Sequence, residues 1–211
     1  MEETAWSTYK LRRRTLLSSA ATLASGVVLL SCDDANAPNP SDAVKNNFVL
    51  ALVKGVQDDA FYTTMQKGAQ IKAKELAATL LVDAPARFDA KLQIPIVNAM
   101  VARKVDALII AACDKEAMIG PLQRAHDAGI KIISVDTYIG DGDYTQGPVT
   151  FPISYIGSDN VEGGKIAGIA LIKALGGKGK IYIQNVSTSI STNAQREQGC
   201  RSAIQATNGA V

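Results

Sequence analysis

The stretch FVLALV, residues 48–53, is a continuous run of apolar residues, and it decides the fold class. A strand with one face in water alternates apolar and polar residues, whereas a strand buried on both faces carries an unbroken apolar run. Behind it, Met65, Ala69, Ala73 and Leu76 recur at the spacing of one helix face. The stretch therefore predicts a buried strand followed by a helix.

The same alternation continues along the chain. Short apolar runs that predict strands occur at 80–82, 107–111 and 130–135, with helical patterns between them. Pro95 fits only near the first turn of its helix, and Gly129 can supply the left-handed residue that ends another helix. Buried strands alternating with helices predict right-handed βαβ units. The predicted fold class is therefore α/β with a parallel sheet.

Residues 137–152 interrupt this pattern with Gly, Asp and Pro, and a second α/β unit begins after them. The predicted elements are an extended segment at 154–156, a helix at 161–175, a strand at 180–186 and a helix at 193–206. Two strands are too few for a stable parallel sheet, because sheets usually hold about four to six strands. We therefore expect that the chain is C-terminally incomplete or that a partner supplies the missing strands.

The folded body is expected to divide into two lobes. The N-terminal α/β lobe spans residues 47–153, and the start of the incomplete second lobe spans residues 154–211. In the helix of the second lobe, Gly163, Gly164 and Gly168 predict close packing of that helix against a sheet.

Residues 1–31 have the layout of an export signal. Arg12, Arg13 and Arg14 are followed by sixteen uncharged residues and, after one serine, by Cys32. This order matches a basic region, an apolar region and a cleavage zone of small residues. An uncharged stretch of this length is too short to cross a bilayer as a helix, which needs about 20 residues.

Two short motifs in the signal indicate how the protein is exported and anchored. Residues 29–32, Leu-Leu-Ser-Cys, resemble the lipobox of bacterial lipoproteins, in which the signal is cut before the cysteine and the thiol is acylated. Residues 13–17, Arg-Arg-Thr-Leu-Leu, resemble the twin-arginine export motif, but adjacent arginines occur in many signals and the export route stays open. An acylated Cys32 would anchor a periplasmic or cell-envelope protein at a membrane without spanning it. Residues 32–46 then predict a flexible tether.

Composition argues against several classes of partner and site. Residues 1–31 hold four of the 22 Lys and Arg and two of the 20 Asp and Glu, which leaves 18 of each and no net charge in the remaining chain. Nothing indicates a nucleic-acid partner, which would need a basic face, and no cluster of metal ligands is evident. Cys113 and Cys200 are too few for a disulfide framework. We expect two separate thiols, with a disulfide as the alternative.

Four motifs stand in order on the predicted elements. They are DDAFY at 58–62, SVD at 134–136, SDNVEGG at 158–164 and AQREQG at 194–199. Over residues 47–211 they resemble the type I periplasmic sugar-binding proteins, and in particular the ribose-binding-like proteins that serve ABC importers. The resemblance implies two Rossmann-like lobes with parallel sheets, joined by hinge strands around a cleft. It also implies a monomer that captures a sugar or polyol without catalysis, uses no cofactor or metal, and delivers its ligand to a membrane permease.

The resemblance further implies which residues bind the ligand. Parallel sheets place ligand sites at the carboxyl ends of their strands, where the first two motifs lie. The implied ligand-binding residues are Asp58, Asp59, Phe61, Tyr62, Asp136 and Arg196. Asp59 and Asp136 would accept hydrogen bonds from hydroxyls, and the rings of Phe61 and Tyr62 would stack on an apolar face of the sugar. Arg196 would clamp the ligand from the second lobe.

Two departures from the family pattern bear on the ligand. The ribose-binding-like proteins usually carry Asn-Asn-Pro-Phe-Phe where this chain has DDAFY at 58–62. They usually carry an arginine after the acid of the fourth strand, where this chain has Thr137. An extra carboxylate and a missing guanidinium change the hydrogen-bonding groups. Another pentose, a hexose, a polyol or a ligand with cationic character is therefore open.

Other interpretations of the same residues stay open. Asp58 and Asp59 could mark only a helix start, and Phe61 and Tyr62 could be core residues. A glycosidase would need two acids facing each other across a sugar, whereas the family binds without chemistry. A sugar-responsive repressor would carry a DNA-binding helix pair before Phe48, where the export signal lies. A sugar-sensing receptor subunit and a non-functional fragment are the remaining alternatives.

Overall fold

Residues 47–211 are described by a computed structural model of the chain. The export signal, Cys32 and the tether predicted for residues 1–46 lie outside the described residues. Across residues 47–211, no helix combines the length and the apolar character that crossing a membrane requires.

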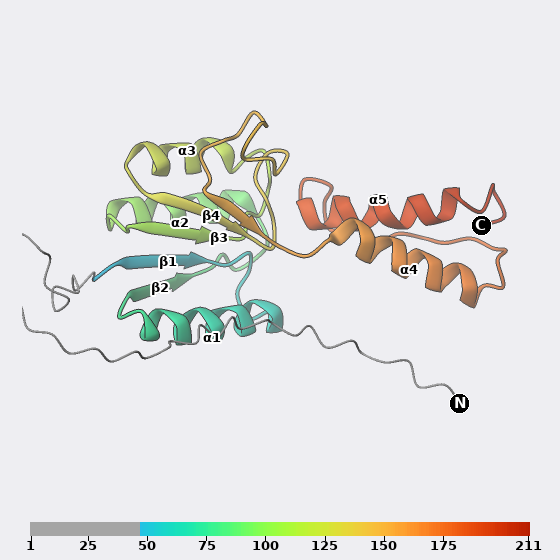
Figure 1. Cartoon of the computed structure of the whole chain (residues 1–211), viewed down its shortest axis with the longest axis horizontal. Coiled ribbons are helices and arrows are strands. Elements are labelled where there is room, and N and C mark those ends of the chain that lie inside the picture. Colours follow the sequence, from blue (N-terminus) through green and yellow to red (C-terminus); the bar gives the residue numbers. More distant parts are fainter. Residues whose placement is uncertain (1–46) are drawn as a thin grey trace, which may run out of the picture. The chain divides into compact units, whose positions relative to one another are not determined.

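A five-stranded parallel sheet organises the first part of the described chain. Its strands are β1 (Val49–Val53), β2 (Thr79–Asp83), β3 (Ala107–Ile110), β4 (Lys131–Val135) and β5 (Ser154–Ile156). They pair in the order β2-β1-β3-β4-β5 (Figure 1). The predicted α/β fold with a parallel sheet is confirmed. β5, which was expected to open the second lobe, is an edge strand of this sheet and pairs with β4.

Helices cover both faces of the sheet. Helices α1 (Ala60–Glu75), α2 (Ala90–Ala102) and α3 (Ile119–Asp127) follow β1, β2 and β3 in turn. Figure 1 shows α1 and α3 on opposite sides of the sheet. Buried side chains of the strands, α2 and α3 form one core, which includes Ala51, Val53, Val97, Met100, Leu108, Ile110, Leu122 and Ile132. Because both faces are covered, the strand sequences carry unbroken apolar runs.

The helix ends follow local chemistry. Asp59 and Asp89 cap α1 and α2, and each side chain accepts a backbone N–H of the first turn, an interaction typically worth about 1 kcal/mol. Gly129 follows the end of α3 with a φ of 91°, as predicted. Pro95 lies inside α2 rather than near its start. The reason is that the cap at Asp89 begins the helix at Ala90.

A buried glutamine ties two strand ends together. Gln93 is fully buried in α2. Its Nε2 donates to the carbonyl oxygens of Lys54 at 3.2 Å and Ala111 at 2.8 Å, and its Oε1 accepts from the backbone N–H of Cys113 at 2.9 Å. Lys54 follows β1, and Ala111 follows β3. The amide therefore satisfies the buried polar groups just beyond two neighbouring strands, which would otherwise each cost about 1–3 kcal/mol.

The two cysteines of the described chain lie in different elements. Cys113 follows β3, and its Sγ lies 3.2 Å from the carbonyl oxygen of Gly55, whereas Cys200 belongs to the last helix. Both are buried free thiols, which agrees with the prediction of two separate thiols. Burial raises the pKa of Cys113 to about 12, so this thiol is protonated at neutral pH.

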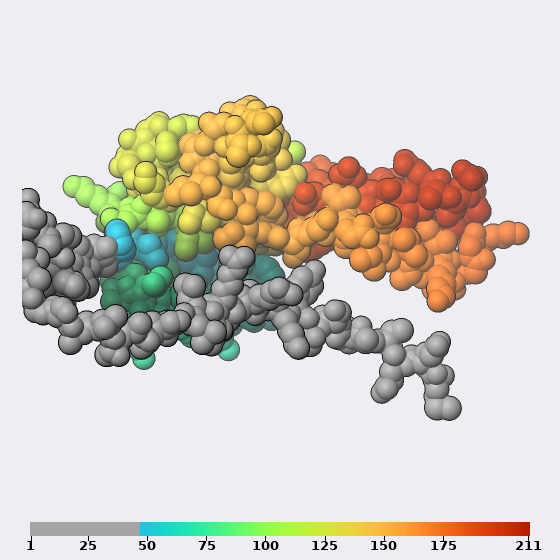
Figure 2. Space-filling view, in the orientation of Figure 1, coloured from blue at the N-terminus to red at the C-terminus, as the bar shows by residue number. Residues whose placement is uncertain are grey.

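The last two helices, α4 (Asn160–Ala174) and α5 (Ser191–Gln205), pack directly on one another. A Cβ at Gly164 would overlap the carbonyl oxygen of Arg196, and a Cβ at Gly199 would overlap that of Val161. A Cβ at Gly168 would lie 3.0 Å from the Cβ of Ala203. In Figure 2 the atoms of α4, in orange, and α5, in red, form one continuous surface. Glycines thus let the two backbones touch.

Two expectations for this region were wrong. Residues 180–186 are not a strand, because no neighbouring strand within residues 47–211 is placed to share backbone hydrogen bonds with them. The glycine prediction was wrong in its partner, because Gly164 and Gly168 face α5 rather than a sheet, and a Cβ at Gly163 would meet nothing within 4 Å.

Substitutions at the neighbouring glycines should have opposite effects. Gly164→Ala should lower the free energy of unfolding by about 1–3 kcal/mol, because the methyl group forces α4 from α5. Gly163→Ala is the matched control and should raise it by up to about 1 kcal/mol, since alanine favours the helix and has room there. Urea denaturation followed by circular dichroism measures both. Equal effects of the two substitutions would contradict the close helix contact.

Removal of the buried amide should also destabilise the protein. Gln93→Leu fills a similar space but leaves two carbonyls and one N–H unpaired, and we expect a loss of at least about 2 kcal/mol. Gln123→Leu is the control, because the side chain of Gln123, which is half-buried on α3, makes one exposed hydrogen bond, to Asp127. If both variants unfold at the same urea concentration, the amide does not stabilise the strand ends.

Candidate functional site

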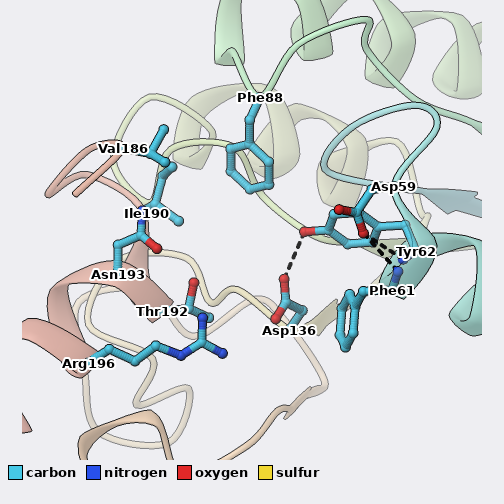
Figure 3. Close-up of a pocket in the computed structure, with 10 residues that line it drawn as sticks. All are labelled: Asp59, Phe61, Tyr62, Phe88, Asp136, Val186, Ile190, Thr192, Asn193 and Arg196. Carbon is cyan, nitrogen blue, oxygen red and sulfur yellow. Dashed lines mark hydrogen bonds between the residues drawn. The ribbon is translucent and has the colours of Figure 1, made fainter. Parts of the chain in front are cut away.

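A cavity of about 390 Å³ opens beyond the carboxyl ends of β1 and β4, a volume typical of small-molecule sites. The residues that line it, drawn in Figure 3, are Asp59, Phe61, Tyr62, Phe88, Asp136, Val186, Ile190, Thr192, Asn193 and Arg196. Five of the six residues predicted to bind a ligand are among them. Asp58 is not, because it is an exposed turn residue with a φ of 51° between β1 and α1.

Asp59 both caps helix α1 and lines the cavity. Its Oδ1 accepts the backbone N–H groups of Phe61 at 2.9 Å and Tyr62 at 3.2 Å, so it caps α1 as the alternative interpretation expected. The same half-buried side chain lines the cavity. The cap holds Oδ1 and leaves Oδ2 as the oxygen that can accept a further hydrogen bond.

Three aromatic rings form one wall of the cavity. The ring of Phe61 is 56% exposed, whereas Tyr62 is only 5% exposed. Tyr62 lies between its neighbours, edge-on to Phe61 at 5.3 Å and stacked on Phe88 at 6.5 Å between ring centroids. A Cβ at Gly55 would lie 2.5 Å from the hydroxyl oxygen of Tyr62, so glycine is needed there. Phe61 is thus the ring with a free face for a ligand.

Asp136 is held in place through its side chain and its backbone. The hydroxyl of Tyr62 donates to Oδ2 of Asp136 at 2.8 Å (Figure 3). The hydroxyl of Tyr155 donates to the carbonyl oxygen of Asp136 at 2.8 Å, and the N–H of Asp136 donates to the carbonyl oxygen of Ile156 at 2.9 Å. These bonds hold a left-handed backbone with a φ of 61°, which costs a non-glycine residue of order 1 kcal/mol or more.

The electrostatics of the cavity centre on this carboxylate. Burial raises the pKa of Asp136, and the charge of Asp59 adds to the rise, while the hydrogen bond from Tyr62 and the charge of Arg196 oppose it. Burial also raises the pKa of Tyr62 far above that of a free phenol, with a further contribution from the charge of Asp136. Tyr62 is therefore a neutral hydrogen-bond donor at all relevant pH values.

Arg196 approaches from α5, across the cavity from Asp136 (Figure 3). Its side chain is exposed and can offer a planar fork of N–H donors. Thr192 and Asn193, from the first turn of α5, add a hydroxyl and an amide to the same wall. An acceptor on one side and several donors on the other suit a small ligand that carries hydroxyl groups.

Sequence reasoning missed five of the lining residues. They are Phe88, Val186, Ile190, Thr192 and Asn193. Phe88 follows β2, so its place at the same sheet edge as Asp59 and Asp136 was a usable signal. Thr192 and Asn193 stand close before Arg196, in a polar run where a helix starts. Val186 was assigned to a predicted strand that does not form, and Ile190 lay between two predicted elements. Neither residue therefore carried a signal for the site.

The described chain offers no site for a metal ion built from its usual ligands. Within residues 47–211, no group of three or more His, Cys, Asp or Glu side chains is placed to hold a cation.

Comparison with known proteins gives one family and a consistent set of relatives. A family described as "periplasmic binding protein domain" matches residues 50–211. The D-ribose/D-allose-binding protein of Pseudomonas aeruginosa is 32% identical over 199 residues, which cover 92% of this chain and 59% of that protein. The ribose import binding protein of Escherichia coli is 31% identical over 184 residues, which cover 87% of this chain and 56% of that protein. The chain thus spans less than two thirds of the length of these relatives.

Solved structures agree with this assignment. An ABC transporter solute-binding protein from Agrobacterium vitis, bound with α-D-tagatopyranose, has a TM-score of 0.74 and 45% identity. The match covers 77% of this chain and 55% of that one. A periplasmic solute-binding protein from Actinobacillus succinogenes, with bound D-allose, has a TM-score of 0.65 and 28% identity over 76% of this chain and 56% of that one. These relatives are named as binding proteins and not as enzymes, in line with the prediction from sequence.

Proposed function

This chain belongs to the family of periplasmic binding protein domains, and from that membership we propose that it binds a sugar or polyol as the solute-binding component of an ABC importer. The ligand would occupy the cavity between the strand ends and α5, and the liganded protein would be recognised by a membrane permease. No bond of the ligand is made or broken in this role. The resemblance found in the four sequence motifs leads to the same family.

One arrangement carries the proposal: an acid, a guanidinium and an open aromatic face line a single cavity. Asp136 can accept from a sugar hydroxyl, Arg196 can donate to hydroxyl or ring oxygens, and Phe61 can cover a face of C–H bonds. A sugar presents all three kinds of surface at once. A purely apolar ligand would leave the carboxylate and the guanidinium unpaired, which costs free energy.

The departures from the family pattern limit the choice of ligand. Thr137 is buried, and its Oγ1 donates to the carbonyl oxygen of Ala112 at 2.8 Å, so this position belongs to the core and supplies no cation to the cavity. Arg196 is then the one guanidinium among the described lining residues. We propose a pentose, hexose or polyol without negative charge, because a ligand with a negative charge would face Asp59 and Asp136.

We also propose that the protein is exported and lipid-anchored through Cys32. The support is the order of Arg12 to Arg14, the uncharged run and the Leu-Leu-Ser-Cys motif. Acyl chains on Cys32 would hold the binding domain at the membrane surface, with residues 33–46 as the tether. Anchoring of this kind would keep the binding domain near a membrane permease.

Sugar binding should appear as thermal stabilisation. The purified full chain would be heated with D-ribose, D-allose, D-tagatose and a set of polyols, and a ligand at 100 times its Kd should stabilise the folded state by about 2.7 kcal/mol. Asp136→Asn and Arg196→Ala should each weaken binding at least about tenfold, the loss of one charge-assisted hydrogen bond. Asp58→Asn removes an exposed acid outside the cavity and should change nothing. If no sugar or polyol raises the melting temperature, the proposed function fails.

The lipid anchor has its own test. Cys32→Ser should abolish incorporation of a radiolabelled fatty acid and move the protein out of the membrane fraction. Ser31→Ala keeps a small residue before the cysteine and should leave both properties unchanged. A Cys32→Ser protein that is still labelled and still sediments with membranes would disprove lipidation at this residue.

A further inference from the structure

Tyr62 and its neighbour Phe61 contribute to the cavity in different ways. Phe61, one residue earlier, leaves 56% of its surface exposed, whereas Tyr62 is 5% exposed and lies packed against the rings of Phe61 and Phe88. Ring stacking on a ligand, which the family resemblance implied for both residues, therefore suits Phe61 better. The part of Tyr62 that faces the site is its hydroxyl, which reaches Asp136 (Figure 3).

The hydrogen bond between Tyr62 and Asp136 constrains what the acid can offer to a ligand. The phenol donates to Oδ2 at 2.8 Å, and in Figure 3 the other carboxylate oxygen is turned away from Tyr62. A free carboxylate can accept from two neighbouring hydroxyls through its two oxygens. With Oδ2 already engaged, Oδ1 is the oxygen that is fully open to a ligand.

The position of the phenol is itself fixed. Gly55 lies so close to Tyr62 that a Cβ there would come within 2.5 Å of the hydroxyl oxygen, and it would also overlap the ring of Phe88. The backbone of Asp136 is held separately, by Tyr155 at its carbonyl oxygen and by Ile156 at its N–H. The carboxylate and the backbone of Asp136 thus depend on hydroxyls from two different tyrosines, one in α1 and one in β5.

From this geometry we propose that Tyr62 is a positioning residue that determines specificity by holding Asp136 in one orientation with one oxygen engaged. The inference rests on the proposed function, because it concerns the same site. It assigns the ligand class more closely: a monosaccharide that meets Asp136 with one hydroxyl is favoured over one that presents an adjacent pair to both oxygens.

The pH dependence of binding separates this role from simple packing. The charged groups that face the carboxylate of Asp136 are Asp59, which raises its pKa, and Arg196, which lowers it. The Tyr62 hydroxyl also lowers the pKa, because its hydrogen bond favours the ionised acid. The Tyr155 hydroxyl bonds only the backbone. Ligand binding through an ionised Asp136 is lost as pH falls through its pKa, so loss of the Tyr62 hydroxyl should move that loss to higher pH.

The test compares Tyr62→Phe with Tyr155→Phe, which removes the other tyrosine hydroxyl that bonds the same residue. The pKa of Asp136 would be measured from the pH dependence of its carboxyl carbon resonance in the full chain. Tyr62→Phe should raise it by about one pH unit, as expected for a lost hydrogen bond to a charged group, and Tyr155→Phe should leave it within a few tenths. Phenylalanine keeps the ring, and circular dichroism verifies that each variant is folded.

Sugar affinity supplies the second readout. The ratios of affinity among D-ribose, D-allose and D-tagatose should change about tenfold in Tyr62→Phe, and binding should weaken at a higher pH than in the wild type. Tyr182→Phe is the control for affinity and should keep the wild-type ratios, because it removes an exposed hydroxyl outside the cavity. An unchanged pKa of Asp136 in Tyr62→Phe, or an equal rise of that pKa in Tyr155→Phe, would overturn the inference. If the wild type binds none of the sugars and polyols of the thermal-stabilisation screen, the proposed function fails instead, and the carbon resonance still decides whether Tyr62 positions Asp136.

Discussion

Parallel pairing of the strands is the constraint on which the site depends. In a parallel sheet every strand ends at the same edge, so the loops after β1, β2 and β4 meet there although they are far apart in sequence. Asp59 follows β1, Phe88 follows β2 and Asp136 follows β4, and all three line one cavity. Gln93 stabilises this edge, because its amide forms hydrogen bonds with the backbone groups just beyond β1 and β3. The scaffold therefore presents an acid and aromatic rings together at one cavity.

The side chains at this edge combine a structural role with a place at the cavity. Asp59 uses one carboxylate oxygen to begin α1 and keeps the other at the cavity. Asp136 keeps a left-handed backbone because Tyr155 and Ile156 hold its carbonyl and N–H, while Tyr62 holds its carboxylate. Such fixed groups lose little further freedom on binding, which favours affinity for a ligand that matches them. If the proposed function holds, a fixed carboxylate would also discriminate between sugars that differ in the direction of one hydroxyl.

The opposite wall of the cavity depends on contact between two helices. Arg196 lies on α5, and the backbone of α5 at this residue touches α4 at Gly164. A larger residue at that point would shift the guanidinium away from its place across the cavity from Asp136. The glycines of α4 and α5 thus affect the site through geometry, although Gly164, Gly168 and Gly199 do not line it.

Local patterns in the sequence determined the parts of this protein that depend on near neighbours. Continuous apolar runs and helical periods predicted the strands of the sheet and the helices, Asp59 marked a helix start, and the ordered motifs identified the family. What depends on distant neighbours was decided by tertiary structure alone. Residues 180–186 have the composition of a strand but do not form one, because a strand needs partners for its backbone hydrogen bonds. The contact of α4 with α5 and the bond from Tyr62 to Asp136 join residues that only packing brings together, so no local pattern could contain them.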